Sequence, residues 1–227
     1  MIDTWLSIFF LSMNTPRNTP QLSTGDPVDY GIDPRNGVCY RNHMENKPAR
    51  STFNPHDLAI VNTAVSMAEE LVSNHYKMSA SQWSGPKYDV KTLADLNGDE
   101  IVSGPFAQII RYEGKLKNDV LGSRAYDFYK ICIQDHAILK VLNDHPEMDL
   151  APFALYVVAH ELIHIVRFSR FLQNFNASDM EKLAEERRVH GITHDILNAV
   201  KTPSGMPSVL AFYASWRAPI DGLKTIP

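Results

Sequence analysis

Residues 155–166 read LYVVAHELIHIV, and the pentapeptide HELIH at the centre places His160 and His164 four residues apart. On an α-helix, at about 100° per residue, two side chains with this spacing lie one turn apart on the same face. Both imidazoles can therefore reach one metal ion, and Glu161 projects beside that ion. The alternative is a chance pentapeptide on a buried helix, in which both histidines are ordinary core residues.

The H-E-x-x-H spacing is typical of zinc metallopeptidases, in which the histidines bind zinc and the glutamate is the general base. A catalytic zinc takes three protein ligands and keeps one position open for water, so a third ligand is expected. In the metzincin version of the motif, Gly and His follow three and six residues beyond the second histidine. Arg167 and Arg170 stand there instead, so this chain does not follow the metzincin pattern.

The segment EKLAEERRVHGITHDIL, residues 181–197, supplies candidates for the third ligand. Ser178 and Glu181 form an S-x-x-E capping box, which predicts a helix from residue 178 to about residue 200. Glu186 and His190 are four residues apart and share one face of that helix. Two antiparallel helices, with H-x-x-x-H on one and E-x-x-x-H on the other, can enclose a single ion.

Glu186 lies 22 residues beyond His164 and is the preferred third ligand. His190 is the alternative third ligand. In that case Glu186 would not bind the metal and would instead contact the residues that do. Glu185 precedes two arginines and is expected on a solvated, charged face of the helix. His194, one turn beyond His190, is expected at the surface rather than at the metal.

Apolar periodicity and turn-forming residues predict the remaining elements. These are a helix at 55–77, strands at 106–112 and 125–133, turns at 83–91, a short helix at 136–142 and the HELIH helix from 152 to about 171. Residues 1–53 are predicted to form an irregular arm, 54–200 the main domain and 201–227 a segment that wraps the core.

Together, residues 125–197 resemble the gluzincin group of metallopeptidases, to which thermolysin belongs. The resemblance rests on HELIH and on the order of elements: the strand YDFYKICI, a short helix, VVAHELIHIV and a glutamate helix. It implies an α+β, zincin-like fold in which a small antiparallel or mixed sheet packs on the active-site helix and the glutamate-bearing helix. It also implies bound Zn²⁺ and a peptide or protein substrate that pairs along the strand at 125–133.

The chain departs from this group at one position. In gluzincins the third-ligand glutamate is the first residue of an E-x-x-x-D motif, and the aspartate of that motif orients the first zinc histidine. Here His190 stands in place of that aspartate, which leaves open what orients His160. Asp195 is a candidate substitute.

The expected function is that of a zinc metallopeptidase, in which zinc activates a water molecule and Glu161 removes its proton. A second interpretation is a degenerate zincin that binds metal or regulates without hydrolysis. A third is a di-iron carboxylate protein, since Glu161 to His164 also form an E-x-x-H. The second E-x-x-H that such proteins need is missing from the sequence.

Composition is that of an ordinary globular protein, with 44% apolar and 21% charged residues. The net charge of -4 and the pI near 6.1 indicate no nucleic-acid partner. Two cysteines, Cys39 and Cys132, are too few for a disulfide framework. The apolar stretch at residues 5–13 is too short to span a bilayer and lacks a basic start. We therefore expect a cytoplasmic protein without a membrane span, with secretion left open by that stretch. The oligomeric state is not predicted.

Overall fold

The computed structural model describes residues 2–6, 30–32, 39–41, 50–79, 87–115, 125–199, 201 and 203–217. The chain divides into two compact units, one of residues 11–50 and one of residues 1–10 with 51–227. The described part of the first unit is an antiparallel pair of strands, β2 (Tyr30–Ile32) and β3 (Cys39–Arg41). The second unit holds the candidate site.

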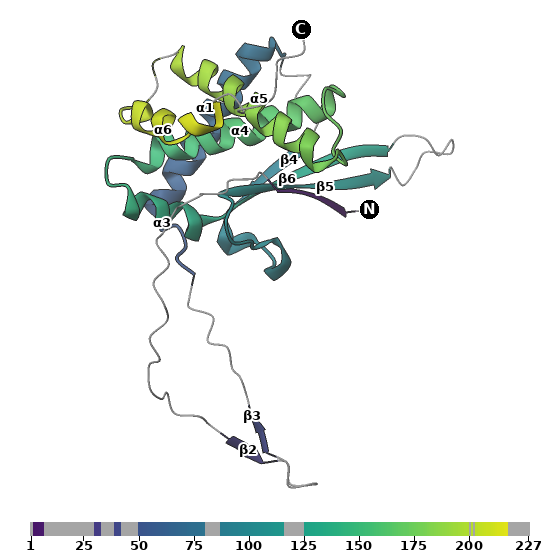
Figure 1. Ribbon diagram of the computed structural model, residues 1–227, viewed down its shortest axis with the longest axis vertical. Coiled ribbons are helices and arrows are strands. Elements are labelled where there is room, and N and C mark those ends of the chain that lie inside the picture. The colour runs from purple at the N-terminus through teal and green to yellow at the C-terminus, as the bar shows by residue number, and fades with distance from the viewer. Residues whose placement is uncertain are drawn as a thin grey trace. The chain divides into compact units, whose positions relative to one another are not determined.

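The second unit is built on a mixed sheet with the strand order β1-β5-β6-β4 (Figure 1). The strands are β1 (Ile2–Leu6), β4 (Lys87–Lys91), β5 (Ala107–Lys115) and β6 (Ala125–Ile133). β5 pairs antiparallel with both β1 and β6, whereas β4 pairs parallel with β6. The predicted α+β class and small mixed sheet are thus confirmed.

Two expectations about the strands are wrong. Residues 87–91, predicted to form turns, are strand β4, which forms because it pairs with β6 far along the chain. The strand at 125–133 is not an edge along which a peptide could pair. β6 uses its main-chain groups on both sides, toward β5 and toward β4, so among the described strands only β1 and β4 lie at the edges.

Five helices accompany the sheet in the described residues. They are α1 (Pro55–Tyr76), α3 (Asp135–Asp144), α4 (Leu150–Ser169), α5 (Asp179–Asn198) and α6 (Met206–Phe212), and 3₁₀ turns occur at Leu93–Asp95, Gly98–Glu100 and Ala214–Arg217. Capping boxes begin α1 at Asn54 and α5 at Ser178. Because a cap satisfies the free N–H groups of the first turn, both helices start where the sequence predicts.

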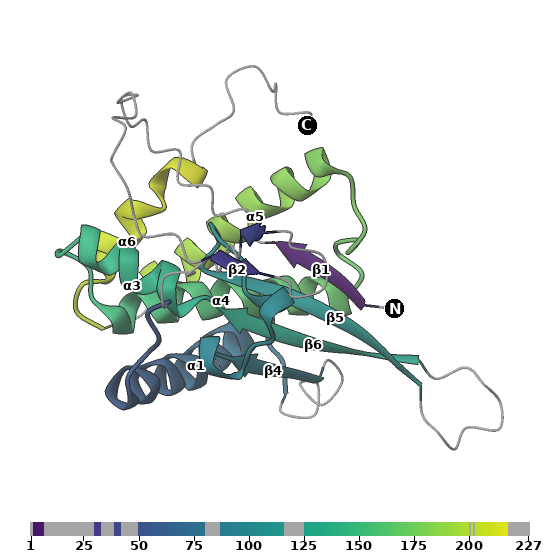
Figure 2. The ribbon, with the colours of Figure 1, turned by 90° about the horizontal axis from the view of Figure 1, so that it is seen from below.

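Helix α4 is the centre of the core and lies on the same side of the sheet as α5 (Figures 1 and 2). Every residue from Pro152 to Phe168 is buried, as expected for a helix that is apolar on all faces. It packs against α1 and α5 and, through Phe168, against Tyr129 of β6. Among the described residues α4 alone is long and apolar enough to cross a membrane. That test is weak for a core helix, and 89% of the apolar window is buried within the protein.

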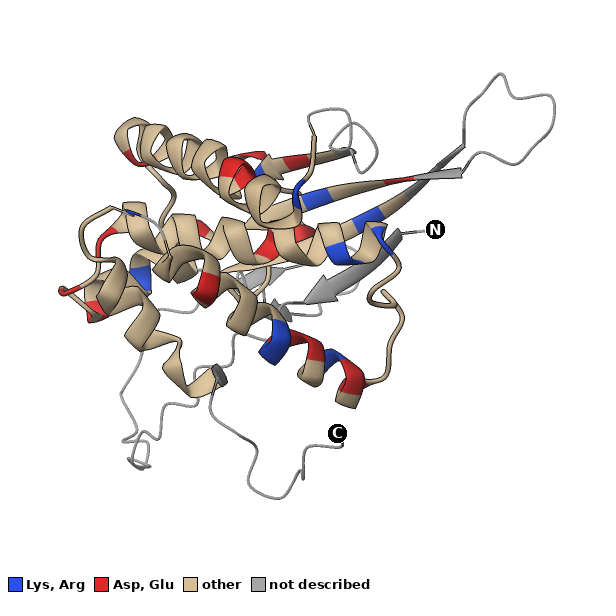
Figure 3. Cartoon of the chain, turned by 90° about the horizontal axis from the view of Figure 1, so that it is seen from above, with Lys and Arg blue, Asp and Glu red and all other residues tan. Residues whose placement is uncertain are grey.

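Helix α5 is polar, and acidic and basic residues alternate closely along the first half (Figure 3). One face of α5 is nevertheless buried against the core and includes Glu185, Glu186 and His190. Burial of such groups is costly unless each finds a partner of opposite charge or a hydrogen bond. The partners come from α4.

Candidate metal centre

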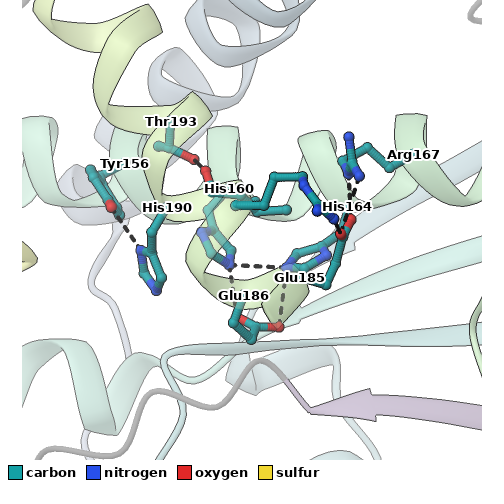
Figure 4. A network of polar contacts seen from close by, with 10 residues as sticks. Tyr156, His160, His164, Arg167, Glu185, Glu186, His190 and Thr193 are labelled. Atoms are coloured by element: carbon teal, nitrogen blue, oxygen red, sulfur yellow. Dashed lines mark hydrogen bonds and ion pairs between the residues drawn. The ribbon is translucent and has the colours of Figure 1, made fainter. Parts of the chain in front are cut away.

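His160, His164 and Glu186 bring their donor atoms together between α4 and α5 (Figure 4). The Nε2 atoms of the two histidines are 3.1 Å apart. Glu186 lies 3.2 Å from His160 through Oε2 and 3.2 Å from His164 through Oε1. The two side chains of α4 are fully buried and that of α5 is 1% exposed. The structure therefore joins the HELIH histidines to the predicted carboxylate.

The spacing of these atoms can be compared with a zinc site. Zinc lies about 2.0–2.1 Å from imidazole nitrogen and carboxylate oxygen, which separates tetrahedral donors by about 3.3 Å. The observed separations of 3.1–3.2 Å are close to that value. Two imidazoles and a carboxylate also form a donor set that catalytic zinc uses. The residues present fit a zinc ion.

His190 lies beside this triangle and bonds to Tyr156 of α4, whose hydroxyl oxygen is 2.8 Å from Nδ1. Donor atoms of His160, Glu186 and His190 all lie within 4.8 Å of one another. Two overlapping donor sets thus share His160 and Glu186. We favour the set with His164, because it contains both histidines of HELIH and its contacts of 3.1–3.2 Å are close to zinc spacing.

Burial and mutual contacts shift the pKa values of the three groups in different directions. Burial alone would raise the pKa of Glu186, but the charge of His164 and hydrogen bonds from both imidazoles hold it well below the usual value. Burial lowers the pKa of His160. Burial would also lower the pKa of His164, but the Glu186 carboxylate outweighs it and raises this pKa. An ionised carboxylate and an uncharged imidazole are the forms that bind metals, so the pKa shifts of Glu186 and His160 favour metal binding and that of His164 opposes it.

Glu161, the expected general base, is fully buried beside the cluster. Burial raises the pKa of Tyr213 well above the usual value, and the charges of Tyr156 and Glu161 add to that effect. Glu161 also adds, after Glu186, to the raised pKa of His164. The Glu161 carboxylate therefore lies within electrostatic reach of both His164 and Tyr213.

Glu185 is not on a solvated face, so that expectation is wrong. Its side chain is fully buried and forms a two-pronged ion pair with Arg167, which is 8% exposed. Arg188, on the exposed face of α5, forms a second ion pair with Glu185 at 2.7 Å. Arg167, which stands where the metzincin pattern has glycine, thus anchors α5 to α4 beside the His160–His164–Glu186 cluster.

This pair predicts unequal effects of two arginine substitutions on stability. Arg167→Met leaves the buried Glu185 carboxylate poorly compensated and should reduce the free energy of unfolding by about 3 kcal/mol. Arg188→Met removes an exposed arginine and should cost less than about 1 kcal/mol. Urea unfolding of both variants measures the difference. Equal losses would show that Arg167 is not the main partner of Glu185.

The remaining candidates lie away from the ligands. His194 pairs with Asp195 at 3.2 Å, and their side chains are 23% and 79% exposed. His194 is thus partly exposed, and Asp195 is largely exposed whereas His160 is fully buried, so Asp195 does not orient His160. Cys132 is a buried free thiol. The Cys39 side chain lies outside the described residues.

The sequence did not indicate the aromatic residues that enclose His190. Tyr213 follows α6 and stacks on Tyr156 with ring centroids 4.0 Å apart and an interplanar angle of 4°. Trp216 stacks on His190 at 4.9 Å. Tyr156 is buried as predicted, but the hydroxyl bond to His190 was missed. A buried tyrosine usually has a hydrogen-bond partner for its hydroxyl. Because Tyr156 lies one turn before His160, its partner could have been expected near the candidate site.

Comparisons with family models, with curated proteins and with solved structures found no match to this chain.

Proposed function

We propose that this protein is a zinc-dependent hydrolase that cleaves peptide bonds. The observation that carries the proposal is the triangle of Nε2 of His160, Nε2 of His164 and the carboxylate of Glu186, with edges of 3.1–3.2 Å. Contact between the two histidines of HELIH and a glutamate 22 residues beyond His164 is what the H-E-x-x-H pattern and its downstream glutamate predict. His160, His164 and Glu186 would hold the ion.

Each residue around the ion has a defined task in this chemistry. A bound zinc lowers the pKa of its water toward neutrality and polarises a substrate carbonyl. Glu161 follows His160 directly and accepts the proton of the attacking water, then returns it to the leaving amine. The Arg167–Glu185 pair keeps α5, and with it Glu186, at a constant distance from α4.

The substrate class depends on the resemblance to gluzincins. Because β6 is interior, a peptide cannot add to it, and main-chain pairing would have to use another element. The assay should therefore include both peptides and small amides.

A second function, metal binding without hydrolysis, is favoured by one observation. His160, Glu161, His164 and His190 are fully buried, and Glu186 is 1% exposed. A metal site closed to solvent suits a structural or regulatory ion, whereas a substrate must reach the catalytic one. Movement of the covering residues would be needed for turnover.

Metal analysis with an activity screen tests the proposal. The purified full-length protein should contain one zinc per chain, and mass spectrometry should detect cleavage of an unstructured peptide library. Chelation should stop cleavage and added zinc should restore it. Hydrolysis that survives chelation, or a protein that binds no zinc, would overturn the proposal. One zinc with no cleavage of peptides or small amides would establish the second function instead.

A further inference from the structure

His190 is restrained on its faces and at one edge. The imidazole stacks on Trp216 at 4.9 Å and 25°, and on Tyr213 at 5.4 Å and 30°. The Tyr156 hydroxyl bonds to Nδ1 at 2.8 Å, and the whole side chain is buried. The ring centroid is 4.4 Å from that of His160. The stacked rings and the hydroxyl bond together hold the imidazole in place.

His190 also lies near two of the three proposed ligands. Its donor atom lies within 4.8 Å of those of His160 and Glu186. Donors of a tetrahedral zinc are about 3.3 Å apart, so His190 would have to move toward these atoms to become a fourth ligand. Four protein ligands would close the site, as in structural zinc centres, and leave no position for water.

We propose that Tyr156 is a positioning residue that holds His190 off the metal and so preserves an open coordination position. This role rests on the proposed zinc site. By keeping a coordination position free for water, Tyr156 would keep that site able to hydrolyse a substrate. It also assigns His190, which stands where the gluzincin pattern has aspartate, to the surroundings of the metal and not to its ligands.

The direction of one hydrogen bond decides this role. When the Tyr156 hydroxyl donates to Nδ1 of His190, the ring proton resides on Nε2, and a protonated nitrogen cannot bind a metal. If Nδ1–H instead donated to the phenolic oxygen, Nε2 would be free to ligate, which is the usual arrangement of metal-bound histidine. A phenolic O–H is a better hydrogen-bond donor than an imidazole N–H, and an imidazole nitrogen is a better acceptor than a phenolic oxygen, so the first direction is favoured.

Cobalt substitution tests the proposal without relying on turnover. The zinc-free full-length protein and its variants are loaded with Co²⁺ alone, whose visible absorption reports the number and type of ligands. Wild type and His190→Ala should give the same spectrum. Tyr156→Phe should give a shifted spectrum, because His190 then joins the shell, and Tyr156→Phe/His190→Ala should return to the wild-type spectrum. Tyr213→Phe is the matched control, since it removes the hydroxyl of the stacked neighbour, and should leave the spectrum unchanged.

The zinc affinity of Tyr156→Phe distinguishes a Tyr156 hydroxyl that donates to His190 from one that accepts from it. If Tyr156 supported a ligating His190, Tyr156→Phe would weaken zinc binding about 10–100-fold. The proposal expects no weakening. A changed spectrum in His190→Ala, or a Tyr156→Phe spectrum identical to wild type, would overturn it.

The wild-type protein alone provides a further test, which does not depend on whether the variants fold. Long-range ¹H–¹⁵N correlation spectra of the zinc-loaded protein should show His190 protonated at Nε2 and unprotonated at Nδ1, and the opposite assignment would refute the proposal. The expected cobalt and NMR results without hydrolysis would support the role of Tyr156 and reject the hydrolase. Hydrolysis by the wild type together with an unchanged cobalt spectrum in Tyr156→Phe would support the hydrolase and reject the role of Tyr156.

Discussion

Glu161→Gln should abolish hydrolysis while the protein still binds one zinc. Glutamine keeps the size of the side chain but cannot accept the proton of the attacking water, and loss of a general base typically costs about 10²–10⁴-fold in rate. Glu161 is fully buried next to His160, so the amide substitution also removes a charge without opening a cavity. The measurements are kcat/KM on the cleaved peptide and zinc content per chain.

Glu70→Gln is the matched control for this result, because Glu70 is exposed on α1. It should retain wild-type turnover and zinc. Turnover by Glu161→Gln within a factor of a few of wild type would remove the proposed mechanism, whatever metal the protein holds. Loss of zinc from the variant would instead mean that Glu161 supports the ligands.

The second large effect is expected from Glu186→Gln, which should weaken zinc binding by more than about 100-fold. Even outer partners of zinc ligands contribute about 10–100-fold to affinity, and a direct carboxylate ligand should contribute more. Glu186 contacts Nε2 of both histidines at 3.2 Å, so its loss removes the carboxylate that faces both imidazoles. Competition with a chromophoric chelator measures the affinity.

His194→Ala is the control for Glu186→Gln, since His194 lies on the same helix but pairs with Asp195 at the surface. Its zinc affinity should equal that of wild type. The alternative ligand is tested by the same assay. Tight zinc binding in Glu186→Gln together with loss of zinc in His190→Ala would identify His190 as the third ligand.

Local sequence signals account for most of the elements. The predicted strand at 125–133 coincides with β6, and the predicted helices at 55–77 and 152–171 lie within two residues of α1 and α4 at each end. Caps and apolar periodicity act within a few residues of the chain, so they can be recognised without knowledge of the fold. The same holds for the one-turn spacing of His160 and His164.

Long-range packing accounts for the errors. β4 is a strand because it pairs with β6 about 40 residues further on, and that pairing also makes β6 interior. Glu185 is buried because Arg167 of another helix reaches it. In each case a partner distant in the sequence changed the environment of the residue, and periodicity carries no information about such partners.

The amino-acid sequence by itself determined which residues could serve a metal: two histidines one helical turn apart, a glutamate beside them and a second helix with Glu186 and His190 on one face. Only the tertiary structure decided how they are used. Packing of α5 on α4 brought Glu186 to 3.2 Å from both histidines and left His190 against Tyr156. Spacing along a helix sets the direction of a side chain, whereas distance between helices depends on how their surfaces fit.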